Sequence, residues 1–349
     1  MIDPCSNTVT RPTRETMARA LCDLNALLDT TYRFYLLSFL SITGFIYLDY
    51  QVMKLNPFNT RIGLALGGGA AKGIAHIGVL KAFEEEQIKI HCISGTSAGA
   101  LIASYYAFGR PAESILSICS TLNLSKIINF TFERGGLFST NTIRAMIHRD
   151  LGDVRIENAD IPLAICATDI ETGEQLIFRE GNLADVVCAS MAVPGLFVPV
   201  EIGGRTLVDG GLVENVPISP LAKMGAGITV AVDLSHVSRY PKPDNTFGVI
   251  TNAINIGIDF NTRKQLRNAD IAVPLDLSNY SLTNNADRVE ELYREGYHPM
   301  KKKIRQVLWY KRMHIAISLL KTTRMLMPFK VPELLKELKR RGFALRKRH

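Results

Sequence analysis

The pentapeptide GTSAG, residues 95–99, holds the clearest candidate for a nucleophile. It places Ser97 between two glycines, directly after one apolar run and directly before another. This spacing is typical of the sharp strand–turn–helix that presents a serine hydroxyl at the end of a sheet. The serine would then lie at a helix N-terminus, where free N–H groups and the helix dipole favour developing negative charge. A serine that only caps a helix in a tight turn has the same pattern, so the motif alone does not decide.

A run of three glycines, Gly67, Gly68 and Gly69, follows an apolar run one unit earlier in the chain. Backbone N–H groups of clustered glycines can converge on an anion, which acyl transfer to a serine requires. A Walker loop is excluded because Lys72 is followed by glycine rather than by serine or threonine, and the dinucleotide fingerprint is excluded because it needs glycine at position 72. An oxyanion-binding loop and a close helix–strand crossing both remain.

A serine nucleophile also needs a base. Three aspartates end apolar runs, Asp169, Asp209 and Asp233, and the ends of strands are where ligands bind in open α/β sheets. Only Asp209 is followed by two glycines, which permit a close backbone approach to the serine loop. An aspartate is a weak base, but it can serve if it takes the serine proton only as the transition state forms.

Histidine is the alternative base. A triad in the order serine, acid, histidine would use Ser97, an aspartate and then His236 or His298. His76 and His91 lie within a helical and a strand pattern, and we expect both to be packing residues.

Strand and helix patterns alternate from Arg61 onward. Unbroken apolar runs in the strands indicate a largely parallel sheet covered on both faces, which is an α/β fold. The predicted strands are residues 61–66, 89–94, 161–169, 174–178, 205–211, 227–235 and 269–276, and the predicted helices are 73–86, 100–108, 182–192, 217–225 and 247–268.

The N-terminal region contains fifteen uncharged residues, Phe34 to Leu48. As a helix they would reach about 22 Å, less than the roughly 30 Å of a bilayer's hydrocarbon core. A secretory signal peptide fits poorly, because a long region with acidic residues precedes the segment and no small-residue cleavage site follows it. A short membrane anchor or re-entrant segment and a helix packed on the main domain are the remaining interpretations.

The charge of the chain is concentrated at its C-terminal end. The net charge is +8, but residues 301–349 hold sixteen Lys and Arg against two Glu, a balance of +14, so residues 1–300 carry −6. Leucines and the pair Trp309 and Tyr310 accompany these cations, a pattern typical of a helix on an anionic membrane surface. Packing on the body and nucleic-acid binding are the rival interpretations. The six cysteines show neither a CxxC pair nor metal-ligand spacing, so neither a disulfide framework nor a zinc site is indicated.

Four ordered motifs resemble one known family. They are GGGAAKGIAHIGVL at 67–80, GTSAG, ATDIETGEQLIF at 167–178, and ASMAVPGLFVPVEIGGRTLVDGGLVENVP at 189–217, followed by GAGITVAVDLS. Residues 61–276 are similar to the patatin-like phospholipases, especially bacterial members. The resemblance implies a three-layer α/β/α fold, a Ser–Asp dyad without histidine, and hydrolysis of fatty-acyl esters of phospholipids or lysophospholipids, with no metal and no cofactor.

Matched residue by residue, the resemblance implies Ser97 as nucleophile, Asp209 as base, and Gly67, Gly68 and Gly69 as the oxyanion hole. Lys72 stands where the family has Arg or Lys, in a structural or anion-steering role. We therefore expect an N-terminal extension (1–58), a catalytic domain (59–298) and a basic helical tail (299–349). The predicted protein is a membrane-associated acyl hydrolase at the cytoplasmic face, whose tail binds anionic lipid and not nucleic acid. Acyl transfer through the same dyad and a non-catalytic membrane scaffold are the alternatives.

Overall fold

The structure of the chain is a computed structural model that describes residues 60–120, 129–130, 136, 138–235, 240, 242–281 and 286–324. The apolar segment Phe34–Leu48, the rest of the expected N-terminal extension, His236 and residues 325–349 of the basic tail lie outside the described residues. Within the described ranges, no helix combines the length and the hydropathy that crossing a membrane would need.

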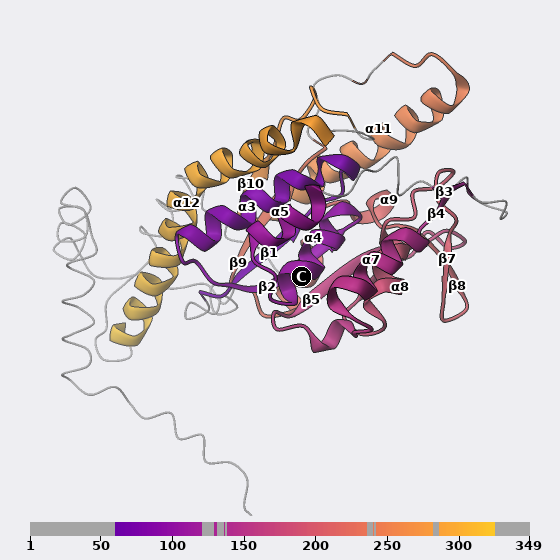
Figure 1. Cartoon of the computed structure of the whole chain (residues 1–349). Helices are drawn as coiled ribbons and strands as arrows, with labels where there is room; N and C mark the ends of the chain where they lie inside the picture. Colours follow the sequence, from indigo (N-terminus) through magenta and orange to yellow (C-terminus); the bar gives the residue numbers. More distant parts are fainter. Residues whose placement is uncertain are drawn as a thin grey trace, which may run out of the picture. The chain divides into compact units, whose positions relative to one another are not determined.

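The described chain is built around one mixed sheet of eight strands, in the order β10-β9-β1-β2-β5-β8-β7, with β6 paired to β5 (Figure 1). The strands are β1 (Ile62–Leu66), β2 (Ile90–Thr96), β5 (Leu163–Asp169), β6 (Gln175–Phe178), β7 (Val200–Ile202), β8 (Arg205–Asp209), β9 (Ile228–Asp233) and β10 (Ile271–Pro274). A separate ribbon pairs β3 (Asn129–Phe130) with β4 (Phe138–Ser139).

The central part of the sheet is parallel. Strands β10, β9, β1, β2 and β5 run in the same direction, and every residue of β1, β5 and β9 is buried. Burial on both faces explains why these strands are apolar without alternation, and it confirms the predicted largely parallel sheet. The other three strands, β6, β8 and β7, pair antiparallel.

Helices cover both faces of the sheet. The helices are α3 (Ile74–Glu85), α4 (Ala98–Ala107), α5 (Ala112–Ser120), α7 (Asn141–Leu151), α8 (Leu183–Ser190), α9 (Gly211–Glu214), α10 (Ser219–Lys223), α11 (Thr246–Leu266) and α12 (Val289–Arg324), with 3-10 turns at η2 (Ala70–Gly73), η3 (Ile156–Asn158) and η4 (Ala286–Arg288).

Alternation of side chains along the strands separates the two helical layers. Cys92 of β2 and Ala164 of β5 belong to the same cluster as Leu221 of α10. On the other face, Gly95 of β2 lies against α4, and Ala167 of β5 packs on α8. Small residues on the α10 side let this short helix approach the sheet closely. The three-layer α/β/α architecture is confirmed.

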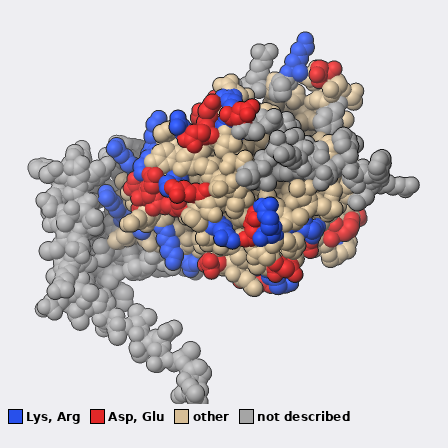
Figure 2. All heavy atoms as spheres, viewed as in Figure 1, with Lys and Arg blue, Asp and Glu red and all other residues tan. Residues whose placement is uncertain are grey.

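The last described helix, α12, spans the position between residues 298 and 299 at which we expect the catalytic domain to end. It runs unbroken through Pro299, and the compact unit that contains the sheet extends from Asn56 to Ile315. Met300 and Val307 are fully buried. Lys301 pairs with Glu85 at 3.0 Å and with Glu86 at 2.7 Å, and acidic and basic side chains lie together over α3 and α12 (Figure 2). Residues 299–315 therefore pack on the body.

Candidate active site

Ser97 lies in the turn between β2 and α4. Its backbone has φ 54° and ψ −123°, a region that a residue with a side chain rarely occupies. The turn is closed by two glycines with no room for a methyl group, since a Cβ on Gly95 would collide with the Gly99 carbonyl and a Cβ on Gly99 with the Leu66 carbonyl. The predicted strand–turn–helix is present, and it holds the serine in a strained conformation that presents its hydroxyl.

Asp209 ends β8 and is brought to Ser97 by the sheet. Strand β8 pairs with β5, where Asp209 lies opposite Ala167, and β5 in turn neighbours β2, which ends at the serine turn. The Ser97 hydroxyl lies near the Asp209 carboxylate, where it acts as a hydrogen-bonding group that lowers the pKa of that carboxyl. Asp209 also accepts the Gly211 N–H at 2.7 Å. Ser97 and Asp209 are only 6% and 8% exposed, so little water reaches the two groups.

Burial raises the pKa of the Asp209 carboxyl to about 6 from its usual 3.8, and the hydrogen bonds from Ser97 and Gly211 oppose this rise. Burial favours the neutral carboxylic acid, whereas donors favour the carboxylate. At neutral pH the group is therefore still mostly ionised. It binds a proton about a hundredfold more tightly than an ordinary aspartate does, which makes it a better base for a serine hydroxyl.

The glycine loop lies against the serine. A Cβ on Gly68 would lie 3.3 Å from Ser97 Cβ and 2.7 Å from Asn215 Oδ1. The N–H groups of Gly67 and Gly68 donate to the carbonyls of Val232 and Asn215, at 3.0 and 3.1 Å. Among the described residues, the Gly69 N–H has no acceptor. An oxyanion would thus find Gly69 open, whereas it would compete with a carbonyl for the N–H of Gly67 or Gly68.

The other two strand-end aspartates are turned to other partners. Asp169 accepts the N–H groups of Glu171 and Thr172 and pairs with Arg205 at 3.3 Å. Asp233 accepts the N–H of Ser235 at 2.9 Å and its hydroxyl at 2.6 Å. Of the three candidates that sequence position leaves open, Asp209 is the one that contacts Ser97.

In the described part of the chain, no histidine is hydrogen-bonded to Ser97 or Asp209. His298 is exposed on α12. His91 accepts the N–H of Ile62 at 3.0 Å. His76 is completely buried, and its Nε2 is 2.7 Å from the Gly67 carbonyl oxygen. Since a carbonyl can only accept, the neutral imidazole donates through Nε2. His76 therefore anchors the glycine loop, a contact beyond the packing role expected for it.

Ser190, the last residue of α8, contacts the backbone of the candidate nucleophile Ser97. Its hydroxyl accepts the backbone N–H of Ser97 at 2.8 Å and donates to the Cys166 carbonyl at 2.6 Å. This pair of bonds ties the strained turn to β5. Sequence reasoning assigned Ser190 no role, although it lies within the segment 189–217 that carries the family resemblance.

Lys72 is buried beside the glycine loop. Burial lowers the pKa of its ammonium, and the carboxylates of Asp259 and Asp276 raise it. No group of three or more His, Cys, Asp or Glu side chains arranged to hold a metal ion occurs among the residues described.

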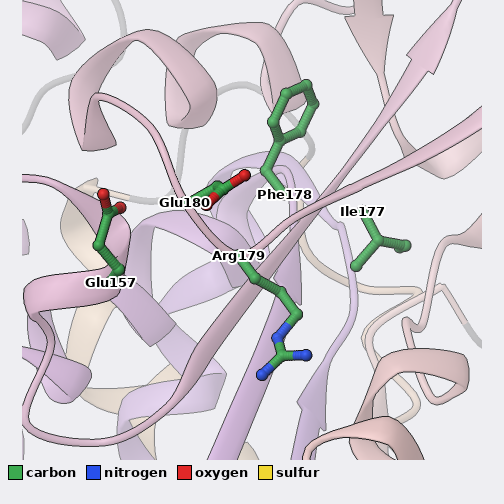
Figure 3. Close-up of a pocket in the computed structure, with 5 residues that line it drawn as sticks. All are labelled: Glu157, Ile177, Phe178, Arg179 and Glu180. Atoms are coloured by element: carbon green, nitrogen blue, oxygen red, sulfur yellow. The ribbon is translucent and has the colours of Figure 1, made fainter.

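A hollow elsewhere on the molecule does not belong to this site. It has a volume of about 450 Å³ and is lined by Glu157, Ile177, Phe178, Arg179 and Glu180 (Figure 3). Phe178 pairs with Ile165, early in β5, whereas Ser97 and Asp209 lie near the later part of β5. The lining contains neither residue of the pair.

Comparison with known proteins agrees with this geometry. Residues 64–222 match the family model described as patatin-like phospholipase. An uncharacterized NTE family protein of Mycobacterium bovis is 33% identical over 197 residues, which are 56% of this chain and 55% of that protein. Lysophospholipase NTE1 of Candida glabrata is 33% identical over 56% of this chain and 12% of its own length. Patatin-like phospholipase domain-containing protein 6 of Mus musculus is 34% identical over 50% of this chain and 13% of its own.

The chain thus spans about half the length of the mycobacterial relative and a much smaller part of the other two. Among solved structures, VipD from Legionella pneumophila has a TM-score of 0.49 at 15% identity, covering 73% of this chain and 67% of that one. This likeness is too distant to inform function. The matched segment, residues 64–222, contains the glycine loop, Ser97 and Asp209, and it is this segment that matches the patatin-like phospholipase family.

Proposed function

We propose that the protein is a serine acyl hydrolase that cleaves fatty-acyl esters of phospholipids or lysophospholipids. The observation that carries this proposal is that a strained turn holds the Ser97 hydroxyl near the buried Asp209 carboxylate and against a glycine loop. The family match and the lysophospholipase name of one relative support a lipid ester as substrate.

The reaction then runs through an acyl-enzyme. Ser97 Oγ attacks the ester carbonyl carbon while its proton moves to Asp209. The protonated Asp209 returns that proton to the departing alcohol, and the ester C–O bond breaks. Water next attacks the acyl-serine and gives its proton to Asp209, which passes it to Ser97 as the fatty acid leaves. A base whose pKa lies near 6 can accept and release the proton at neutral pH.

The oxyanion of each tetrahedral intermediate would be held at the glycine loop. We assign the Gly69 N–H as its first donor, because this group has no acceptor among the described residues. Gly67 and Gly68 would shape the loop and, having no side chains, leave space for the substrate beside Ser97. The N-terminus of α4, which begins directly after Ser97, adds a favourable dipole.

A lipid substrate requires access to a membrane. We therefore retain, as proposals, membrane association at the cytoplasmic face and binding of anionic lipid by the basic C-terminal residues. Replacing the cations of residues 336–348 by glutamine should weaken salt-sensitive binding to anionic liposomes. Unchanged binding would refute this role for the tail.

The catalytic proposal is tested with a fluorophosphonate probe and with mass spectrometry of lipid products. Wild-type protein should take up the probe and release fatty acid from phosphatidylcholine or lysophosphatidylcholine. Ser97→Ala and Asp209→Asn should do neither, whereas His236→Ala and His298→Ala should keep both activities. Equal labelling of wild type and Ser97→Ala would refute the nucleophile. Loss of activity in a histidine variant, with activity kept in Asp209→Asn, would favour a triad. Acyl groups recovered on an added lysolipid rather than as free acid would identify a transferase.

A further inference from the structure

Helix α11 exposes an unusual concentration of large apolar side chains. In the described part of the chain six large hydrophobic residues are exposed, and four of them lie on this helix. The four are Val249, Ile250, Ile256 and Phe260, with exposed fractions of 54%, 52%, 51% and 60%. Single exposed apolar residues are ordinary, but a group on one element marks an interaction surface.

Three of these four residues, together with Ala253, form one continuous stripe. Val249, Ala253, Ile256 and Phe260 follow the spacing of four, three and four residues that places side chains on one face of a helix. The apolar part of this stripe is about 17 Å long. The same face continues with the exposed cations Lys264 and Arg267, and Lys264 Nζ lies 4.0 Å from the centre of the Phe260 ring.

The helix cannot rotate to hide this face, because polar contacts hold the opposite one. Asp259 is the only acidic residue of α11, and it is buried and hydrogen-bonded to the Tyr240 hydroxyl. Thr262 is also buried, and Gln265 Nε2 donates to the Val213 carbonyl at 2.6 Å. The protein-facing side of α11 thus combines these polar groups with Ile258 and Leu266, and the exposed side nevertheless carries large apolar residues.

The stripe also lies close to the candidate active site. Helix α11 packs on α9, which begins at Gly211, two residues after Asp209. A Cβ on Gly211 would lie 3.0 Å from an Asp209 carboxylate oxygen and 3.8 Å from Cδ1 of Ile258, a residue of α11. Helix α11 lies at the outer edge of the described body, at the upper right of Figure 1.

We infer that this face of α11 is a docking surface for a phospholipid bilayer. Val249, Ile250, Ile256 and Phe260 would enter the outermost acyl region, while Lys264 and Arg267 would meet lipid phosphates. An apolar stripe that ends in cations and has no acidic residue on its exposed face has the charge and polarity of a helix lying in a membrane interface. The delivery of lipid from this surface to Ser97 rests on the proposed function, whereas the binding itself does not.

The test measures sedimentation of full-length Ser97→Ala protein with vesicles, so that no lipid is consumed. Ile256→Asn/Phe260→Asn should lower the partition coefficient at least about tenfold on vesicles of phosphatidylcholine with or without phosphatidylserine. Lys264→Gln/Arg267→Gln should lower it about tenfold only on vesicles that contain phosphatidylserine. The controls Ile170→Asn and Lys89→Gln/Arg179→Gln make the same changes on other elements, and we expect less than a twofold effect.

A second pair, Val249→Ser/Ile250→Ser, guards against local misfolding because it changes a different turn of α11. When Ser97 is left intact, both apolar double variants should hydrolyse a water-soluble short-chain ester at the wild-type rate. The inference is overturned if both pairs bind vesicles like wild type. It is also overturned if wild type is a dimer that these variants dissociate without a change in vesicle binding. If no ester is hydrolysed but the binding pattern holds, the docking surface stands and the proposed function fails.

Discussion

Replacing Asp209 by asparagine should cost activity and stabilise the fold. Burial raises the pKa of this carboxyl from 3.8 to about 6, and each pKa unit corresponds to about 1.4 kcal/mol. Below pH 4 the group is protonated in both the folded and the unfolded chain, so it has no effect on stability. Between about pH 4 and pH 6 the unfolded chain loses the proton first, and stability falls as the pH rises. Above pH 6 the full destabilisation, about 3 kcal/mol, is present.

Because asparagine is neutral, we expect Asp209→Asn to raise the free energy of unfolding by up to about 3 kcal/mol at pH 7.5 and by about half of that at pH 5. This figure already includes the opposing effect of the Ser97 hydroxyl and the Gly211 N–H on the pKa of the carboxyl. Urea denaturation at the two pH values measures the difference, and esterase turnover is measured on the same samples.

The matched control is Asp233→Asn, which removes another buried strand-end carboxylate whose hydrogen bonds come from Ser235. It should destabilise the protein because it weakens those bonds. The reasoning is refuted if Asp209→Asn is less stable than wild type at both pH values, or if its stability gain does not grow between pH 5 and pH 7.5.

Three further changes probe the support of the site. His76→Phe leaves the Gly67 carbonyl without its donor and should lower kcat with little change in KM, while His76→Gln, which keeps an N–H donor, should restore part of kcat in steady-state assays. Ser190→Ala removes the acceptor for the nucleophile's own N–H and should lower kcat about tenfold, with unchanged folding by circular dichroism. Gly99→Ala should destabilise the protein by more than about 3 kcal/mol in thermal unfolding, because its methyl group would collide with a β1 carbonyl, whereas Gly257→Ala on α11 meets open space and should stabilise it by about 0.5–1 kcal/mol.

The parts of the site that sequence predicts well are those in which only one type of residue fits the local structure. Gly95 and Gly99 are required because carbonyl groups occupy the space of a side chain, so the elbow is visible in the letters. The place of Asp209 at a strand end before two glycines predicts its role as the base. The structure explains why the first of these two glycines is needed: Gly210 lies so close to the Cys166 carbonyl that a Cβ would collide with it.

Other features depend on backbone groups that any residue supplies, and they could not be predicted. The carbonyls that occupy the N–H groups of Gly67 and Gly68 belong to Val232 and Asn215, which are distant in sequence and carry no signal of this contact. Composition also does not reveal the contacts of α12. The cations begin at Lys301, but this lysine pairs with two glutamates of the body, and the packing of α12 continues to Ile315.

Periodicity likewise predicts that a helix has an apolar face without saying which way that face points. The predicted helix 247–268 agrees closely with α11, Thr246–Leu266. Its orientation is decided by the polar groups on the other side, chiefly Asp259 and Gln265, which bond to Tyr240 and to the Val213 carbonyl. The sequence does not show these contacts. They fix the orientation of α11, so that an apolar face which periodicity would assign to the core is exposed.

The pH dependence of catalysis can distinguish the aspartate from a histidine even though both titrate near pH 6. We expect kcat/KM to rise with pH through about 6, because Asp209 must lose its proton to act as the base. An unperturbed histidine would titrate in the same range. Burial, however, lowers the pKa of His76 to about 4, and burial with nearby cations also lowers the pKa of His91. His76 is thus neutral before Asp209 titrates.

The rising limb should therefore persist unchanged in position in His76→Gln and His298→Gln, whatever their effect on the maximal rate. In the dyad mechanism it should move only when Asp209 or its hydrogen-bond donors are altered. A variant without the Ser97 hydroxyl would show no turnover and hence no pH profile. The informative variant is therefore Asp209→Glu, because its longer side chain changes both the burial of the carboxylate and its contact with Ser97. A limb that shifts or disappears in a histidine variant while Asp209→Glu keeps the wild-type profile would assign the proton transfer to imidazole and contradict the dyad.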